Sequence, residues 1–248
     1  MQNLPELLDS IPQLKHGLQN VKKNIQCESG KTSMDKIIIK DLIDEDFVNY
    51  KTPCMFISTY LCNWKCCKEN GLDISTCQNY STVNKPNLEI KISDIYKRYI
   101  NNPITKSIVI GGLEPLLQYQ ELCELIKYFR EHDCQDDIVI YTGYYPYEVM
   151  LILEQLAPYN NLIFKFGRYI PDRPEKYDKV LGVKLASDNQ YGVRMTNDKK
   201  LALEIIKDAQ EKTGHCPCMI KENDNTLCCC LSFKNQHEGD CHCGLWNK

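Results

Sequence analysis

The sequence predicts an α/β fold built around a mainly parallel sheet. Apolar runs of strand length recur along the chain, and amphipathic patterns of helix length follow two of them. Continuous apolar strands that alternate with helices are typical of parallel sheets buried on both faces. Right-handed crossovers then produce a partial or complete barrel, or an open doubly wound sheet, with the chemistry at the carboxyl ends of the strands. The predicted strands lie at 55–60, 107–112, 137–143 and 161–170, and the helices at 119–132 and 147–158.

The chain is predicted to have three parts. Residues 1–33 carry leucines at helical spacing and form an N-terminal helical extension, which caps the core or binds a partner; capping is favoured. Residues 34–198 contain the predicted strands and form the main domain. Residues 199–248 begin with a helical pattern and continue as a cysteine-dense module.

Composition narrows the classes of function. The formal net charge of −3 provides no basic field for nucleic acid or an anionic membrane. No apolar stretch approaches the roughly 20 residues needed to cross a bilayer, and the N-terminus lacks the apolar run of a secretory signal. We therefore expect a cytoplasmic protein. In a reducing cytosol, 15 cysteines at short spacings indicate metal or redox chemistry rather than a disulfide framework.

Three cysteines, Cys62, Cys66 and Cys77, follow the first predicted strand on one loop. Soft thiolates bind iron, and three of them can hold three irons of a cubane cluster while the fourth iron takes a substrate. Cys54 and Cys67 remain alternative ligands. Zinc is an alternative metal, although it would need a fourth ligand, which Cys54 or Cys67 could supply.

The first strand with its cysteine loop, GGLEPLLQ at 111–118 and YTGY at 141–144 resemble the radical SAM superfamily. More narrowly, they resemble the activating proteins of anaerobic (class III) ribonucleotide reductases. That family usually shows C-x3-C-x2-C, whereas Glu69 stands here at the third position, and Cys77, followed by Gln78-Asn79, takes the place of the last cysteine. The segment from Gly167 to Gln190 is similar to the family's Gly-Arg, leucine-rich and Ser-Asn-Gln elements.

The resemblance implies a partial (βα) barrel of the radical SAM type that holds one 4Fe–4S cluster and S-adenosylmethionine (SAM). The cluster ligands would be Cys62, Cys66 and Cys77. The residues that would contact SAM are Gly111, Gly112, Glu114, Tyr141, Thr142, Gly143, Ser187 and Asn189.

The tail resembles the catalytic chain of ferredoxin:thioredoxin reductase through Cys216-Pro217-Cys218, Cys228-Cys229-Cys230 and Cys241-His242-Cys243. This resemblance implies a small, mostly helical domain with a second 4Fe–4S cluster on Cys216, Cys228, Cys230 and Cys241. It implies a redox-active disulfide between Cys218 and Cys243, with His242 as the proton donor. A zinc knuckle is the alternative, although C-x-C is a poor spacing for ordinary zinc fingers.

Together the resemblances imply a radical SAM activase that generates a glycyl radical on anaerobic ribonucleotide reductase. A ferredoxin, flavodoxin or thioredoxin-like carrier would be its electron partner. Two alternatives stay open: a ferredoxin-dependent disulfide reductase or electron-transfer protein without SAM chemistry, and a zinc-binding interaction module without redox activity.

Overall fold

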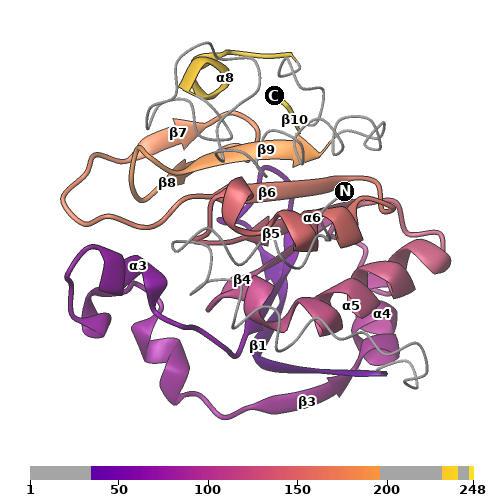
Figure 1. Ribbon diagram of the computed structural model, residues 1–248. Coiled ribbons are helices and arrows are strands. Elements are labelled where there is room, and N and C mark those ends of the chain that lie inside the picture. Colours follow the sequence, from indigo (N-terminus) through magenta and orange to yellow (C-terminus); the bar gives the residue numbers. More distant parts are fainter. Residues whose placement is uncertain (1–34, 196–230, 240–245) are drawn as a thin grey trace, which may run out of the picture. The chain divides into compact units, whose positions relative to one another are not determined.

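The computed structural model describes residues 35–195, 231–239 and 246–248 (Figure 1). The chain divides into two units, Met1–Ser33 and Met34–Lys248, and all the described residues belong to the second. The predicted N-terminal helical extension therefore lies outside the described residues.

A sheet of eight strands forms the centre of the second unit, in the order β10-β9-β6-β5-β4-β2-β1-β3. Its four inner strands, β2, β4, β5 and β6, pair in parallel, whereas the strands outside them pair antiparallel. The strands are β1 (Lys36–Asp46), β2 (Cys54–Thr59), β3 (Leu88–Lys91), β4 (Ser107–Gly112), β5 (Asp137–Tyr141), β6 (Leu162–Phe166), β9 (Tyr191–Met195) and β10 (Trp246–Asn247). A separate antiparallel pair consists of β7 (Lys176–Asp178) and β8 (Val183–Leu185).

Helices connect the parallel strands, as parallel pairing requires. Helix α5 connects β4 to β5, and α6 connects β5 to β6. Helices α4 and α5 lie side by side (Figure 1), with the ring of Tyr99 5.6 Å from that of Phe129. The helices are α3 (Lys65–Glu69), α4 (Ile92–Ile100), α5 (Tyr119–Glu131), α6 (Met150–Leu156) and α8 (Leu231–Asn235), and the 3-10 turns are η1 (Ile74–Thr76), η2 (Tyr80–Asn84), η3 (Pro115–Gln118) and η4 (Pro146–Glu148).

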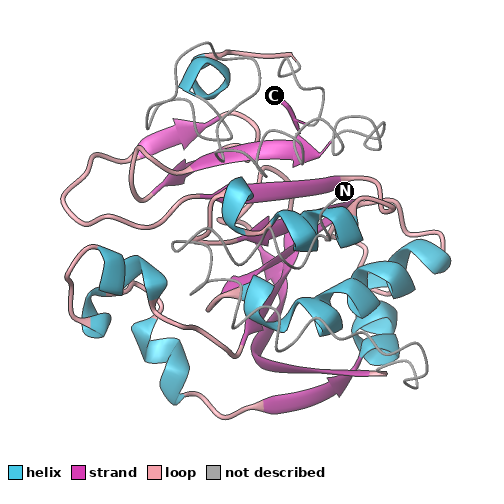
Figure 2. Ribbon diagram, in the orientation of Figure 1, coloured by secondary structure: helices cyan, strands magenta, loops and turns pink. Residues whose placement is uncertain are grey.

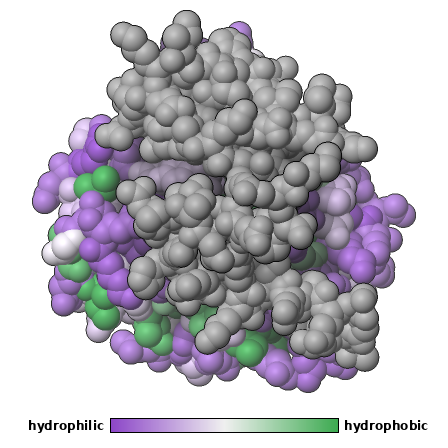
Figure 3. All heavy atoms as spheres, viewed as in Figure 1, coloured by the Kyte–Doolittle hydropathy of each residue, from purple (hydrophilic) through white to green (hydrophobic). Residues whose placement is uncertain are grey.

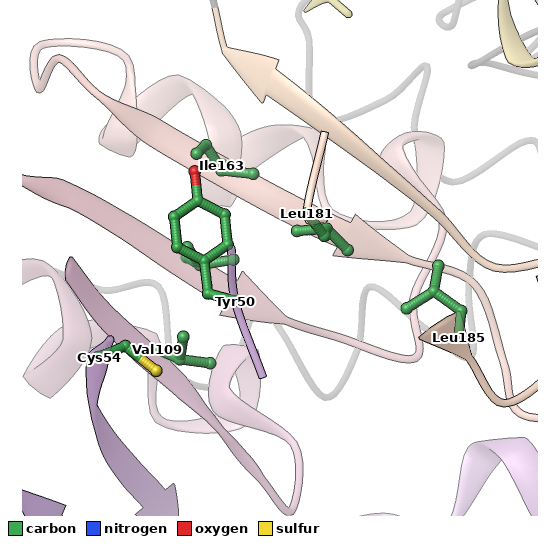
Figure 4. Close-up of a cluster of buried hydrophobic side chains, with 7 residues drawn as sticks. Tyr50, Cys54, Val109, Ile163, Leu181 and Leu185 are labelled. Atoms are coloured by element: carbon green, nitrogen blue, oxygen red, sulfur yellow. The ribbon is translucent and has the colours of Figure 1, made fainter. Parts of the chain in front are cut away.

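The side chains on both faces of the parallel strands are buried. Val109, Val139 and Ile163 lie in one register row and point to the same face, because side chains alternate along a strand. Leu181 and Leu185 pack on that row and complete a buried cluster (Figure 4). The next row, which includes Ile110, Ile140 and Phe164, is fully buried on the opposite face.

The α/β class with a parallel centre is confirmed, but the sheet is not closed into a barrel. Its edge strands are β10 and β3, and they remain unpaired with one another. The structure therefore supports a mixed α/β protein whose parallel strands all end at one edge of an open sheet. That edge is where ligands bind in open α/β sheets.

Candidate functional site

The cysteine loop leaves the sheet at the end of β2 and contains only short helical segments (Figure 2). Trp64 has a left-handed backbone conformation with φ of 59°. This turn brings the Trp64 N–H within 3.3 Å of the Cys62 sulfur, to which it donates a hydrogen bond. Cys66 lies in α3, and Cys77 ends the turn η1. The loop therefore presents its three candidate ligands from three consecutive local structures.

Electrostatics connects the three thiols. Burial raises the pKa of Cys62 to about 12, and negative charge on Glu114, Cys66 and Cys77 raises it as well. Burial also raises the pKa of Cys66, against the effect of the Tyr169 N–H, Lys165 and Arg168. Without a cation these thiols hold their protons, whereas a bound metal deprotonates a coordinating thiol outright. The site is thus suited to a metal centre that supplies the missing positive charge.

Glycine at position 143 leaves room for the Cys66 sulfur. A Cβ atom at that position would lie 2.5 Å from Cys66 Sγ and 3.6 Å from Glu114 Oε2. No side chain larger than hydrogen fits there unless the cysteine moves. The predicted YTG element at the end of β5 therefore lies directly against a predicted cluster ligand.

Glu114 joins the ends of β4 and β5. Its buried carboxylate accepts hydrogen bonds from the Thr142 hydroxyl at 2.7 Å and from the Gly143 N–H at 2.9 Å. It also accepts from the Leu116 N–H at 3.1 Å and so caps η3. Burial raises its pKa. The backbone N–H of Glu114 donates to the Leu61 carbonyl at 2.7 Å, which attaches the cysteine loop to the same point.

The two glycines before Glu114 allow close packing of neighbouring strands. Gly112 has a φ of +79°, and a Cβ there would lie 2.1 Å from the Ser58 hydroxyl oxygen. A Cβ at Gly111 would lie 3.3 Å from atoms of Phe56 and Tyr141. Position 112 therefore requires glycine for the packing of β4 against β2, whereas a side chain at position 111 would need only a small shift of Phe56 or Tyr141.

Tyr141 lies on the face covered by Leu181 and Leu185. Its hydroxyl donates to the Asn49 carbonyl at 2.5 Å. Thr142 follows it and points the other way, toward Glu114. Of the predicted YTG element, Thr142 and Gly143 thus meet Glu114, whereas the Tyr141 hydroxyl meets the loop before β2.

The Ser-Asn-Gln element lies against the end of β6. Asn189 donates through its side-chain nitrogen to the Arg168 carbonyl at 2.7 Å. Its side-chain oxygen is buried and makes no hydrogen bond within the described part of the chain. Ser187 is fully buried, and its hydroxyl accepts from the Ile170 N–H at 3.4 Å. The unpaired Asn189 oxygen is a vacant acceptor at the same edge as the cysteine loop.

An ion-pair network attaches α3 to the ends of β5 and β6. Arg168 Nη2 lies 2.6 Å from Glu148, and its Nε lies 2.6 Å from Glu69 in α3. Lys65 pairs with Glu148 as well as with Glu69. Burial alone would raise the pKa of Glu148, but Arg168 and Lys65 lower it. We call Lys65, Glu69, Glu148 and Arg168 the clamp, because they hold the cysteine-bearing helix on the sheet.

Lys165 is a site residue that the sequence analysis missed. It is the residue before the last one of β6, at the end of the strand that faces the site. It pairs in register with Tyr141, and its ammonium lies 5.9 Å from the centre of the Tyr141 ring. Burial lowers its pKa to about 8, while Cys66 and Glu114 oppose that shift. A lysine inside an otherwise apolar strand is the signal that could have identified it.

Some predicted site residues belong to the part of the chain that the structure does not describe. Those of the C-terminal module, Cys216, Cys218, Cys228, Cys230, Cys241, His242 and Cys243, lie outside the described residues. All seven cysteines of the described ranges are free thiols. Within those ranges, no three His, Cys, Asp or Glu side chains converge on a point where one metal ion could bind. A cubane cluster does not need such a point, because each of its irons takes its own thiolate.

The donor set fits an iron–sulfur cluster. The loop offers soft thiols that interact with one another, backbone N–H groups directed at two of the sulfurs, and a glycine that leaves space beside Cys66. Hydrogen bonds to cluster sulfurs and partial burial are the features that tune such centres. The fold and this site define an α/β metalloprotein of the iron–sulfur class.

The family comparison identifies the class more closely. A family model described as a 4Fe-4S single cluster domain matches residues 54–180, which is just over half of the chain. The chain therefore belongs to this family and binds at least one 4Fe–4S cluster. No curated protein sequence and no solved structure matches it.

Hydrophilic side chains predominate on the described part of the face in Figure 3, with smaller groups of hydrophobic ones between them. Within the described ranges, every helix is too short or too polar to cross a membrane.

Proposed function

We propose that this iron–sulfur protein is a radical SAM activase that generates a glycyl radical on an anaerobic ribonucleotide reductase. The observation that carries the proposal is the meeting of four separate sequence elements at one edge of the sheet. Cys66 of the loop lies against Gly143, which donates to Glu114, and Asn189 donates to the backbone of Arg168. These elements are the ones whose resemblance to that family was noted in the sequence.

Cys62, Cys66 and Cys77 would hold the cluster, which when bound and reduced would supply one electron for the cleavage of SAM to methionine and a 5′-deoxyadenosyl radical. Glu114 contributes a carboxylate that three donors already orient toward the cysteine loop. Within the described residues its second oxygen accepts from the Gly143 N–H alone, and a carboxylate oxygen can also accept from an ammonium group of a ligand.

Asn189 contributes the one buried acceptor of the site that is still unpaired within the described residues. An unsatisfied buried carbonyl oxygen costs about 1–3 kcal/mol, which a ligand donor would recover. Gly111, Gly112 and Gly143 leave the backbone accessible where side chains would collide with Ser58, Tyr141 or Cys66.

The C-terminal module supports a second redox step. Its C-x-C pairs would hold another 4Fe–4S cluster beside the Cys218–Cys243 disulfide. The module would pass electrons to the first cluster, or reduce a disulfide of the reductase or of a thioredoxin-like carrier. The alternative function, disulfide reduction without SAM chemistry, rests on this module alone.

Anaerobic reconstitution of the full chain tests the proposal. Two clusters correspond to about eight irons and eight sulfides per chain, and a reduced sample incubated with SAM should form 5′-deoxyadenosine. The matched pair of variants is N189A, which removes the unpaired acceptor, and N160A, which removes an amide distant from the site. We expect N189A to weaken SAM binding by about tenfold, equivalent to about 1.4 kcal/mol, and N160A to leave it unchanged.

The outcomes separate the candidate functions. Full iron content with neither SAM binding nor cleavage would exclude the activase and leave the disulfide reductase. Cleavage of SAM without radical formation on the glycyl radical protein would exclude that partner. Stoichiometric zinc with little iron would contradict both cluster assignments.

A further inference from the structure

Lys165 places a positive charge beside a predicted cluster ligand. Its strand position pairs with Tyr141, so its side chain lies on the same face as the Tyr141 ring. Its ammonium donates to the Gly167 carbonyl at 3.3 Å. The anionic groups that act on this ammonium are Cys66 and Glu114, which themselves flank the same point next to Gly143.

The Glu114 carboxylate acts on the charge of Lys165 without forming an ion pair with it. Within the described ranges Lys165 forms no ion pair, because Glu148 and Glu69 are taken by the clamp residues Arg168 and Lys65. A partly buried ammonium without a carboxylate partner is costly, and nearby negative charge offsets that cost. Three thiolates and the cluster they bind would supply such charge.

We propose that Lys165 is the counter-charge of the cluster held by Cys62, Cys66 and Cys77, and that it raises the reduction potential of that cluster. This inference rests on the loop being the cluster site of the proposed function. Reduction adds one electron from an external one-electron carrier and one negative charge to the centre, with no bond formed or broken. A fixed cation nearby favours the more negative, reduced state, because net charge and its surroundings set the potential of such clusters.

The consequence is functional. A centre that must pass electrons to a substrate also has to accept them from its own donor. Lys165 makes that first transfer easier without touching the iron. Lys165 is therefore not a ligand of the cluster, and it acts on the cluster by its charge, from the side of Cys66.

The test is an EPR-monitored redox titration of the reconstituted full chain without SAM. Cys228→Ser and Cys230→Ser serve as the background, because they remove the second proposed cluster and isolate the signal of the loop cluster. Lys165→Met removes the charge and keeps the length, whereas Lys165→Arg keeps the charge. Lys97→Met removes a charge from a side chain that is 68% exposed on α4.

We expect Lys165→Met to lower the equilibrium constant for reduction about tenfold, which is about 59 mV for one electron. Lys165→Arg and Lys97→Met should stay close to the parent. An unchanged midpoint in Lys165→Met with full iron content overturns the inference. Absence of a loop cluster in the parent itself overturns the proposed function instead, so the two failures are distinguishable.

Assembly provides the second readout. If Lys165→Met does not retain iron, Lys165→Gln is titrated in its place, since it keeps a donor and lacks the charge. Loss of iron in both neutral variants with retention in Lys165→Arg also supports the counter-charge. Loss of iron in Lys165→Arg as well would show that the side chain acts by packing, and would overturn the inference.

Discussion

Local electrostatics links the candidate ligands of the loop to one another. Cys66 and Cys77 both raise the pKa of the Cys62 thiol, and Cys77 also raises the pKa of Cys67. Cys67 is buried, with 4% of its surface exposed, and burial raises its own pKa. The choice of Cys77 over Cys67 as the third ligand stays a prediction of the sequence analysis.

Substitution of the two cysteines tests this choice. Cys77→Ala should remove the loop cluster, about half of the iron if two clusters are present, because one of three thiolates is lost. Cys67→Ala is the matched control and should keep its iron, with only the loss of a small buried side chain. Iron and sulfide per chain after anaerobic reconstitution are the measurements. A reversed result would make Cys67 the ligand.

The residues of the site divide into those that a motif can identify and those that only packing brings together. The cysteines, Glu114, Gly143 and Asn189 were predicted from their neighbours along the chain. Lys165 was not predicted, because it is a single charged residue in an apolar strand. Its role in the site comes from its interaction with Cys66, which is 99 positions away in sequence. No local pattern encodes a contact of that range.

At the scale of elements, helix α3 is too short to be stable in its position without tertiary contacts. It has five residues, and its N-cap residue Trp64 offers no side-chain cap. A helix this short is not stable alone in water. The clamp therefore determines where Cys66 lies, because Arg168 joins Glu69 of α3 to Glu148 of η4.

Removal of Arg168 should release the cysteine helix. The side chains of Arg168 and Glu148 are only 5% and 11% exposed, and breaking a buried pair costs about 3–5 kcal/mol because a charge remains unpaired. We expect R168A to lose iron rapidly to a chelator and to unfold at lower urea concentration. Arg173, 46% exposed and paired with Asp188, supplies the control R173A. Equal behaviour of the two variants would mean that the clamp does not position the ligands.

The elements of the core were predictable, and those at its margins were not. The runs at 55–60 and 107–112 correspond to β2 and β4, and the helical pattern at 119–132 to α5. In contrast, β1 was missed, because its apolar residues are interrupted by Lys40, Asp41 and Asp44. Near the edge of a sheet one side of a strand meets water, so the continuous apolar signal disappears.

No strand was predicted in segment 171–199, which contains β7, β8 and β9. Its prolines and glycines are typical of loops, and its short strands are stabilised by tertiary contacts. Leu181 and Leu185 pack on the sheet, and Asp178 accepts from the Gly192 N–H at 2.8 Å. Strands of three residues have no periodicity to detect, so only the packed structure reveals them.

At the scale of the whole molecule, a partly buried ion pair joins two strands that are not neighbours in the sheet. Asp137 at the start of β5 receives two hydrogen bonds from Arg194 of β9, at 2.7 and 2.8 Å, and one from the Tyr50 hydroxyl at 2.9 Å. Burial would raise the pKa of Asp137, but these partners lower it overall. The folded state therefore holds this carboxylate more strongly ionised than the unfolded chain does.

This shift predicts a dependence of stability on pH. A depressed folded pKa contributes stability that is fully present above the ordinary aspartate value of about 3.9. The contribution disappears as the pH falls through the lower folded value. D137N should therefore lower the free energy of unfolding near neutral pH and lose its effect in acid. Urea unfolding of the parent, D137N and D94N across this range is the measurement, with Asp94 as an exposed control. A constant difference at every pH would contradict the linkage.

The end of the chain is part of the core of the sheet. Trp246 of β10 is fully buried, with its ring 5.6 Å from that of Phe166 and 6.2 Å from that of Phe164. The prediction that residues 199–248 form a separate domain thus has to accommodate a terminal strand that belongs to the main sheet. A chain cut near Gly214 would lose this tryptophan together with the cysteines.

W246A should be among the most destabilising single changes. Truncation of a buried aromatic side chain costs about 3–5 kcal/mol, and the whole sheet should unfold at lower urea concentration. Y177A, at a position that is 60% exposed, is the control and should have little effect. If W246A unfolds like the parent, β10 does not contribute to the core, and the tail can be removed as a unit.

The pairing of Trp246 with Met195 gives the chain an unusual topology. In the sequence, residues 196–245 join the end of β9 to the start of β10, and these two strands pair with one another. Closing such a connection depends weakly on its length, since each doubling adds only about 0.6 kcal/mol. The seven cysteines between Cys216 and Cys243 thus lie, in sequence, between two paired strands of the sheet. The pairing of β9 with β10 depends little on how many residues join the two strands.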